Sequence, residues 1–271
     1  MNILWFSEIS KEDVESCGGK GASLGEMYKI GLPIPQGFVI TSNAYKEFLQ
    51  KNRIDKKIYN ILENVDLTNI KSLQIKSKEI QEIIMNAEFS NSTKNDVLEA
   101  YDNLNVNQDL VKLHKSALSL IKAGRDLPYV AVRSSANAED SPTVSFAGQQ
   151  ATYLNVKGNA SLINAVKKCW ASLFTTRAIY YREKNKFEHD KVLIAVVIQR
   201  MINSEKSGVM FTINPSTNNP KEIMIEAGFG LGELIVSGSI NPNNYIVDKE
   251  TLDIKNKKIT KQAYLLTRNE Y

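Results

Sequence analysis

The sequence changes character at Pro128, and this change constrains the fold more than any other feature. From Ser42 to about Lys122, apolar residues recur at helical spacing with almost no glycine, which predicts several amphipathic helices. Beyond Pro128 the patterns predict a buried strand over 129–132, one long helix over 161–184, and strands over 191–199, 207–213, 222–227 and 244–248. Long helices followed by a run of antiparallel strands favour an α+β fold over a doubly wound parallel sheet.

Shorter elements are predicted before and within the helical stretch. The segments 3–6 and 37–40 are apolar and predict strands, and a helix over about 22–30 should end at Gly31, shortly before a proline. Thr68 is the predicted N-cap of a helix whose isoleucines form one stripe. The helical stretch from Ser42 to about Lys122 is predicted to pack the core and to carry no chemistry.

Length, hydropathy and cysteine content exclude several classes of protein. A chain of 271 residues can form one large or two small domains with a sizeable core. Its longest apolar run, Val192–Ile198, is far shorter than the roughly 18 residues that a membrane span needs. No basic-then-apolar leader is visible, and Cys17 and Cys169 have no metal-ligand spacing. We therefore predict a cytoplasmic protein that does not insert into membranes.

The net charge of +4 does not predict nucleic-acid binding. The basic residues form short clusters at 51–57 and 255–258, and no basic stripe interleaved with aromatic residues is visible. Both clusters are interpreted as solvated faces or turns.

The run Gly18-Gly19-Lys20-Gly21-Ala22-Ser23 opens the first predicted helix. Backbone N–H groups at a helix N-terminus favour an anion, and Lys20 adds a movable positive charge. The spacing is not that of a P-loop, so the run considered alone is more simply interpreted as an ordinary turn.

Arg133 follows a short apolar strand and precedes two serines. A guanidinium at the end of a strand suits a pair of phosphate oxygens. A structural ion pair with Glu139 or Asp140 is the alternative.

Three later segments are weaker candidates. Ser145–Gln150 contains small residues and Gln149, which suits close approach of a ligand or an ordinary hairpin tip. The strand ending in Gln199, Arg200, Met201 and Ile202 could border a purine through its backbone, or could belong to the core. Glu226 precedes a glycine-rich turn and could bind ribose hydroxyls or help to hold Mg²⁺.

The two histidines give no catalytic signal. His114 lies in a helical pattern and His189 in a charged loop, and neither has the setting of a nucleophile or a metal ligand. Both are interpreted as incidental.

Taken together and in this order, five segments resemble the N-terminal nucleotide-binding domain of the phosphoenolpyruvate synthase and pyruvate phosphate dikinase family, which rifampin phosphotransferases share. The segments are 18–27, 130–136, 145–150, 211–212 and 225–233, with Arg-Ser-Ser-Ala and Phe-Ala-Gly-Gln as their most specific pieces. The resemblance covers nearly the whole chain. It implies a two-lobed ATP-grasp fold, with a first lobe over 1–197 that includes a helical insertion at 42–124, and a second, incomplete lobe over 198–271.

The resemblance also implies roles for individual residues. Lys20 and Arg133 should bind the ATP phosphates, and Gly148, Gln149 and Thr152 should cover them. Gln199, Met201 and Ile202 should line the adenine pocket, and Glu226 should face the ribose.

In this family, the ATP β-phosphate passes to a histidine on a separate swivelling domain and then to pyruvate on a further domain. Neither domain has a counterpart in this sequence, and the stretch expected to carry most Mg²⁺ ligands lies beyond its C-terminus. We therefore expect a C-terminally truncated, ATP-binding part of a phosphoenolpyruvate synthase that is inactive alone. The alternatives are a part of a rifampin phosphotransferase and a stand-alone, non-catalytic nucleotide-binding module.

Overall fold

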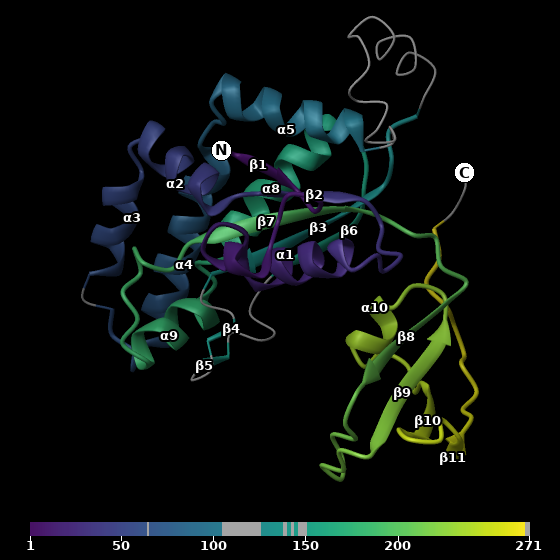
Figure 1. Cartoon of the computed structure of the whole chain (residues 1–271). Helices are drawn as coiled ribbons and strands as arrows, with labels where there is room; N and C mark the ends of the chain where they lie inside the picture. The colour runs from purple at the N-terminus through teal and green to yellow at the C-terminus, as the bar shows by residue number, and fades with distance from the viewer. Residues whose placement is uncertain (64, 105–125, 138–139, 142–143, 146–150, 269–271) are drawn as a thin grey trace, which may run out of the picture. The chain divides into compact units, whose positions relative to one another are not determined.

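The computed structural model describes residues 1–63, 65–104, 126–137, 140–141, 144–145 and 151–268, in two compact units, Met1–Met201 and Ile202–Tyr271 (Figure 1). Both units contain helices, and every strand pairing among the described residues is antiparallel. The predicted α+β class and the antiparallel pairing are confirmed.

A five-stranded sheet forms the centre of unit 1. Its order is β1 (Ile3–Trp5), β2 (Gly37–Ile40), β7 (Ile194–Arg200), β3 (Val130–Ala136) and β6 (Thr152–Val156). The strand β7 therefore lies between two strands that precede it by many residues. A separate pair, β4 (Asp140–Ser141) and β5 (Val144–Ser145), completes the strands of this unit.

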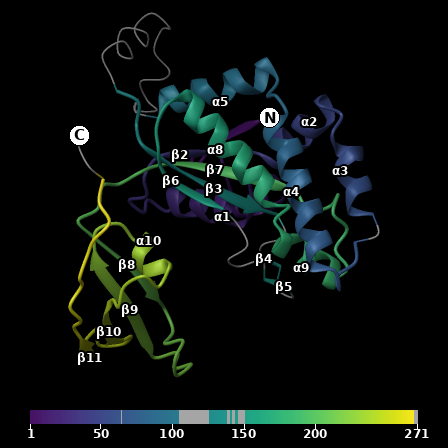
Figure 2. The ribbon, with the colours of Figure 1, turned by 180° about the vertical axis from the view of Figure 1, so that it is seen from behind.

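Helices cover both faces of this sheet, with α1 (Val14–Lys29) on one face and α8 (Asn159–Ser172) on the other (Figures 1 and 2). The alternation along β7 explains this arrangement: Val196 and Ile198 join the large core on the α8 side, whereas Ala195 and Val197 join a smaller core with α1. A strand covered on both faces needs apolar residues at every position, as its sequence predicted. The large core also contains residues of α2 (Ser42–Lys51), α3 (Asp55–Leu62), α4 (Ile70–Asn86), α5 (Asn91–Asn103) and α9 (Thr176–Lys184).

The helix α1 begins earlier than predicted and is interrupted. A short 3₁₀ turn (Lys11–Asp13) leads into it, and Gly18 breaks it with φ 66° and ψ 169°. Its predicted end at Gly31 is confirmed: the N–H of Gly31 donates to the Tyr28 carbonyl and that of Leu32 to the Met27 carbonyl, which is a Schellman motif.

Two other predictions about helices are wrong. Asn69, and not Thr68, caps α4, because its Oδ1 accepts the Ser72 N–H at 3.0 Å, whereas the Thr68 hydroxyl donates to Asp66. The predicted helix over 161–184 is two helices, α8 and α9. Thr175 has extended backbone and caps α9 by accepting the Ala178 N–H at 3.3 Å.

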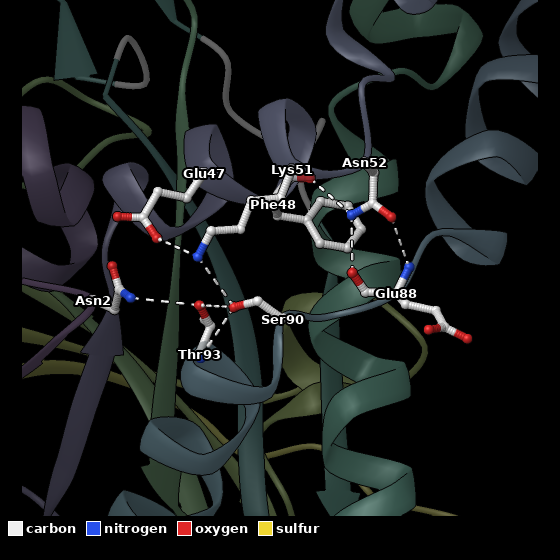
Figure 3. Close-up of polar contacts among 8 residues, drawn as sticks. All are labelled: Asn2, Glu47, Phe48, Lys51, Asn52, Glu88, Ser90 and Thr93. Carbon is white, nitrogen blue, oxygen red and sulfur yellow. Dashed lines mark hydrogen bonds and ion pairs between the residues drawn. The ribbon is translucent and has the colours of Figure 1, made fainter.

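The end of α2 is tied to the connection between α4 and α5 (Figure 3). Asn52 donates from Nδ2 to the carbonyl oxygens of Phe48 and Glu88, both at 2.9 Å, and its Oδ1 accepts the Glu88 N–H at 3.1 Å. Ser90 caps α5 and also accepts from Lys51 Nζ at 3.4 Å. Side chains thus satisfy backbone groups that a turn leaves unpaired.

Unit 2 is an antiparallel meander with a short helix. Its sheet order is β11 (Ile254–Lys258), β10 (Asn243–Asp248), β9 (Glu222–Phe229) and β8 (Lys206–Phe211), and α10 (Glu233–Val236) follows β9. Across the described residues of both units, no helix combines the length and the apolarity that crossing a bilayer requires.

Candidate functional site

The break in α1 creates a second helix N-terminus inside that helix. After Gly18 the helix resumes with Gly19, Lys20 and Gly21, whose N–H groups are in the first turn and have no helical carbonyl before them. Such amides, aligned with the helix dipole, attract anions. The sequence indicated this glycine turn as a candidate for anion binding, which stays a prediction, and the helix begins earlier than the sequence indicated.

Ser135 of β3 holds this turn against the sheet. Its Oγ accepts the Gly21 N–H at 3.4 Å, and the residue is fully buried. A Cβ at Gly18 would lie 2.2 Å from Ser135 Oγ and 2.4 Å from the Ser135 carbonyl oxygen. Glycine is therefore required at position 18 both by this close approach and by a backbone conformation that only glycine adopts readily.

Arg133 lies two residues before Ser135 on β3 and therefore on the same face of the sheet. Its cross-strand partners are Thr152 of β6 and Val197 of β7, and Val197 packs in the core beneath α1. The register thus places Arg133 and Thr152 side by side on the α1 face. Arg133 is half-buried and Thr152 is exposed.

Lys20 is half-buried in the turn, within electrostatic reach of Cys169 on α8. Burial raises the pKa of the Cys169 thiol to about 12, and the Lys20 charge opposes that rise. Cys169 Sγ lies 3.8 Å from the Val132 carbonyl oxygen of β3 and 4.0 Å from the carbonyl oxygen of Ala151, which precedes β6.

Two expected phosphate-loop residues, Gly148 and Gln149, lie outside the described residues. The same is true of Glu139 and of the Asp140 side chain, the alternative ion-pair partners of Arg133. Their predicted contributions stay predictions.

Gln199 also lies on the α1 face, since it pairs with Ala131 and Gly37 in the same alternation. Its Nε2 donates to the Pro35 carbonyl at 3.3 Å. The next backbone N–H groups are engaged in the sheet, because Arg200 donates to Gln36 and Met201 donates to Tyr129. A ligand at the C-terminal end of β7 would therefore contact the backbone through the Met201 carbonyl or through groups that follow it.

Ile202 and Glu226 belong to unit 2, and Met201–Ile202 is the junction of the two units. Ile202 is exposed, and Glu226 is half-buried on β9 between Val209 of β8 and Asn244 of β10. The structure thus groups Lys20, Arg133, Thr152 and Gln199 on one face of unit 1, and it describes Ile202 and Glu226 separately.

The interpretation of His189 as incidental is wrong. Its Nδ1 accepts the Arg182 Nε–H at 2.8 Å, and its Nε2 lies 2.7 Å from Glu183 Oε1. Arg182 is fully buried. The sequence signal for the burial of Arg182 was its spacing. Arg182 follows Ala178 by four residues, which places both on the apolar face of α9. His114 lies outside the described residues.

Among the described residues, no three His, Cys, Asp or Glu side chains gather in a way that could hold a metal ion. Lys20, Arg133 and the amides of the glycine turn supply positive charge and N–H donors, which suit an anionic ligand such as a chain of phosphates.

Comparison with known proteins agrees with this chemistry. Residues 14–271 match the family described as "Pyruvate phosphate dikinase, AMP/ATP-binding domain". The chain belongs to this family.

Among similar proteins of the family, the probable phosphoenolpyruvate synthase of Methanocaldococcus jannaschii is 45% identical over 99% of this chain and 21% of that protein. The probable phosphoenolpyruvate synthase of Archaeoglobus fulgidus is 45% identical over 100% of this chain and 34% of its own length. The phosphoenolpyruvate synthase of Helicobacter pylori is 41% identical over 96% of this chain and 31% of its own length. The chain thus spans between a fifth and about a third of these relatives.

Proposed function

We propose that this chain is the ATP-binding part of a phosphoenolpyruvate synthase. In the complete enzyme, the β-phosphate of ATP would pass to a histidine on a swivelling domain and then to pyruvate on another domain. The names of the relatives support this assignment over the rifampin phosphotransferase alternative. The two compact units support an ATP-grasp arrangement with lobes over 1–197 and 198–271 and helical segment 42–124 within the first.

One observation carries the proposal: the glycine turn of α1 packs against Ser135 of β3, two residues after Arg133 on the same face of that strand. The amide of Gly19 would bind a phosphate oxygen, Lys20 would supply a movable charge, and the planar guanidinium of Arg133 would bind a pair of phosphate oxygens. Thr152 would donate its hydroxyl beside Arg133. The close packing at Gly18 fixes these donors in advance, and positioning is most of what phosphoryl transfer requires of a protein.

The remaining assignments follow the family resemblance. Gly148 and Gln149 would cover the phosphates, Gln199, Met201 and Ile202 would border the adenine, and Glu226 would face the ribose. Mg²⁺ would arrive with ATP and neutralise the phosphates, and the residues described here would orient those phosphates around it.

Arg133→Ala tests the proposal. Loss of a charge-assisted contact should weaken ATP binding by about 1.5–3 kcal/mol, a rise in Kd of about 10- to 150-fold, which calorimetry measures directly. The matched control is Arg177→Ala on the exposed surface of α9, which should leave the Kd unchanged.

Circular dichroism and a thermal melt of both variants accompany the titration. An Arg133→Ala protein that melts early, or one that binds ATP normally, would contradict the proposed role and favour a structural ion pair.

A further inference from the structure

The large core of unit 1 contains hydrogen-bond donors that have no acceptor. Arg182 Nη1 and Nη2, Trp170 Nε1 and Tyr45 Oη are all buried and lack a hydrogen-bond partner. The three residues are at most 1% exposed. Buried polar groups are normally paired, so such a group points to an occupant.

These side chains belong to α2, α8 and α9, and ring contacts connect their surroundings. The rings of Tyr45 and Trp170 have centroids 5.7 Å apart. One turn after Trp170, the Phe174 ring lies 5.4 Å from Arg182 Cζ. Tyr45 is also the first electrostatic influence on the pKa of Arg182, ahead of the adjacent Glu183.

The charge of Arg182 is not balanced by direct contact with a carboxylate. Its Nε donates to His189 Nδ1, so that imidazole is neutral there and carries its proton on Nε2, which donates to Glu183. The Glu183 carboxylate is therefore separated from the guanidinium by a neutral ring. A buried cation in this position is costly, and burial lowers the pKa of Arg182 to about 10.

We propose that a monovalent anion of halide size binds between the Nη groups of Arg182 and the hydroxyl of Tyr45. The indole N–H of Trp170 is a further donor in the same cluster. The donor set favours an anion over water, because an anion accepts several hydrogen bonds and needs no acceptor, whereas a water brings two hydrogens of its own. A halide would also neutralise the buried guanidinium.

A surface pocket lies beside α2 and α3, and Tyr59, one of its lining residues, is within electrostatic reach of Arg182. That pocket has a volume of about 190 Å³ and is lined by Lys46, Tyr59, Asp55 and Asp190 among others. Its two carboxylates disfavour an anion, and Arg182 does not line it.

Thermal unfolding of the protein tests the proposal, with chloride replaced by gluconate at constant ionic strength. A ligand that binds only the folded state raises the Tm with its concentration, so chloride should raise it and the bulky gluconate should not. Tyr45→Phe keeps the ring but removes one donor, and it should weaken chloride binding about tenfold or more. Tyr180→Phe, on the exposed surface of α9, should retain the full chloride effect.

Crystals soaked in bromide give an independent readout, since an anomalous peak beside Arg182 would locate the ion. Equal Tm values in chloride and gluconate, an unchanged chloride effect in Tyr45→Phe, or a bromide-soaked crystal without a peak at Arg182 would each overturn the proposal. None of these measurements involves ATP, so their failure would leave the proposed function untouched.

Discussion

At the scale of single residues, His189 is a neutral hydrogen-bond acceptor for the buried Arg182. This pairing makes the free energy of unfolding depend on pH. Burial, followed by the Arg182 charge, lowers the pKa of His189 in the folded chain. Below about pH 6.5 the unfolded chain therefore binds more protons at this residue than the folded chain does. We expect the free energy of unfolding to fall as the pH drops through about 6.5, and to level off below the folded pKa.

Urea unfolding at several values between about pH 8 and about pH 5 measures this effect. His189→Gln keeps a side-chain acceptor but cannot titrate, so its unfolding free energy should lose this part of the pH dependence. Parallel curves for the two proteins would show that His189 does not control acid stability.

At the scale of the element, α1 depends on two glycines for different reasons. Gly18 and Gly31 both have positive φ, but a Cβ at Gly18 would collide with Ser135 whereas a Cβ at Gly31 would have nothing within 4 Å. Gly31→Ala should therefore lower the free energy of unfolding by about 1 kcal/mol, through backbone strain alone. Gly18→Ala should lower the free energy of unfolding by about 3 kcal/mol or more, because steric overlap with Ser135 adds to the backbone strain.

Urea denaturation of the two variants separates these costs, and Gly31→Ala serves as the control for backbone conformation alone. Gly18→Ala should also displace the N–H groups of the anion-binding turn, so ATP binding should weaken in that variant and not in Gly31→Ala. Equal losses of stability would mean that Ser135 does not constrain the helix.

At the scale of the whole molecule, the hydrophobic core belongs to unit 1. Every residue of the two core clusters lies between Phe6 and Ile198, so none comes from unit 2. We expect residues 1–201 to fold alone and to unfold in one cooperative transition, because both core clusters are built from residues of this range.

Circular dichroism and calorimetry of the 1–201 chain test this expectation, and a broad, non-cooperative melt would contradict it. The Arg133→Ala variant of the same shortened chain gives a further comparison. Its stability should match that of the parent, since Arg133 is half-buried and belongs to neither core cluster.

Local patterns in the sequence determined much of this protein. The continuous apolar run of 192–198 indicated a strand buried on both faces, and Gly31 predicted the end of α1. The glycine turn and Arg133 were also identified as anion-binding candidates, because backbone N–H groups and a guanidinium have that chemistry in most settings. These features depend on neighbours a few residues away.

Tertiary structure alone decided the rest. Ser135 approaches Gly18 from a strand more than a hundred positions away, and β7 inserts between β2 and β3, so no local pattern could reveal either contact. Arg182 is a further case, because its charge predicts an exposed side chain whereas it is fully buried, with Phe174 packed 5.4 Å from its guanidinium. Local preference fixes which element a segment forms, whereas burial and hydrogen bonding across distant segments decide which residues meet.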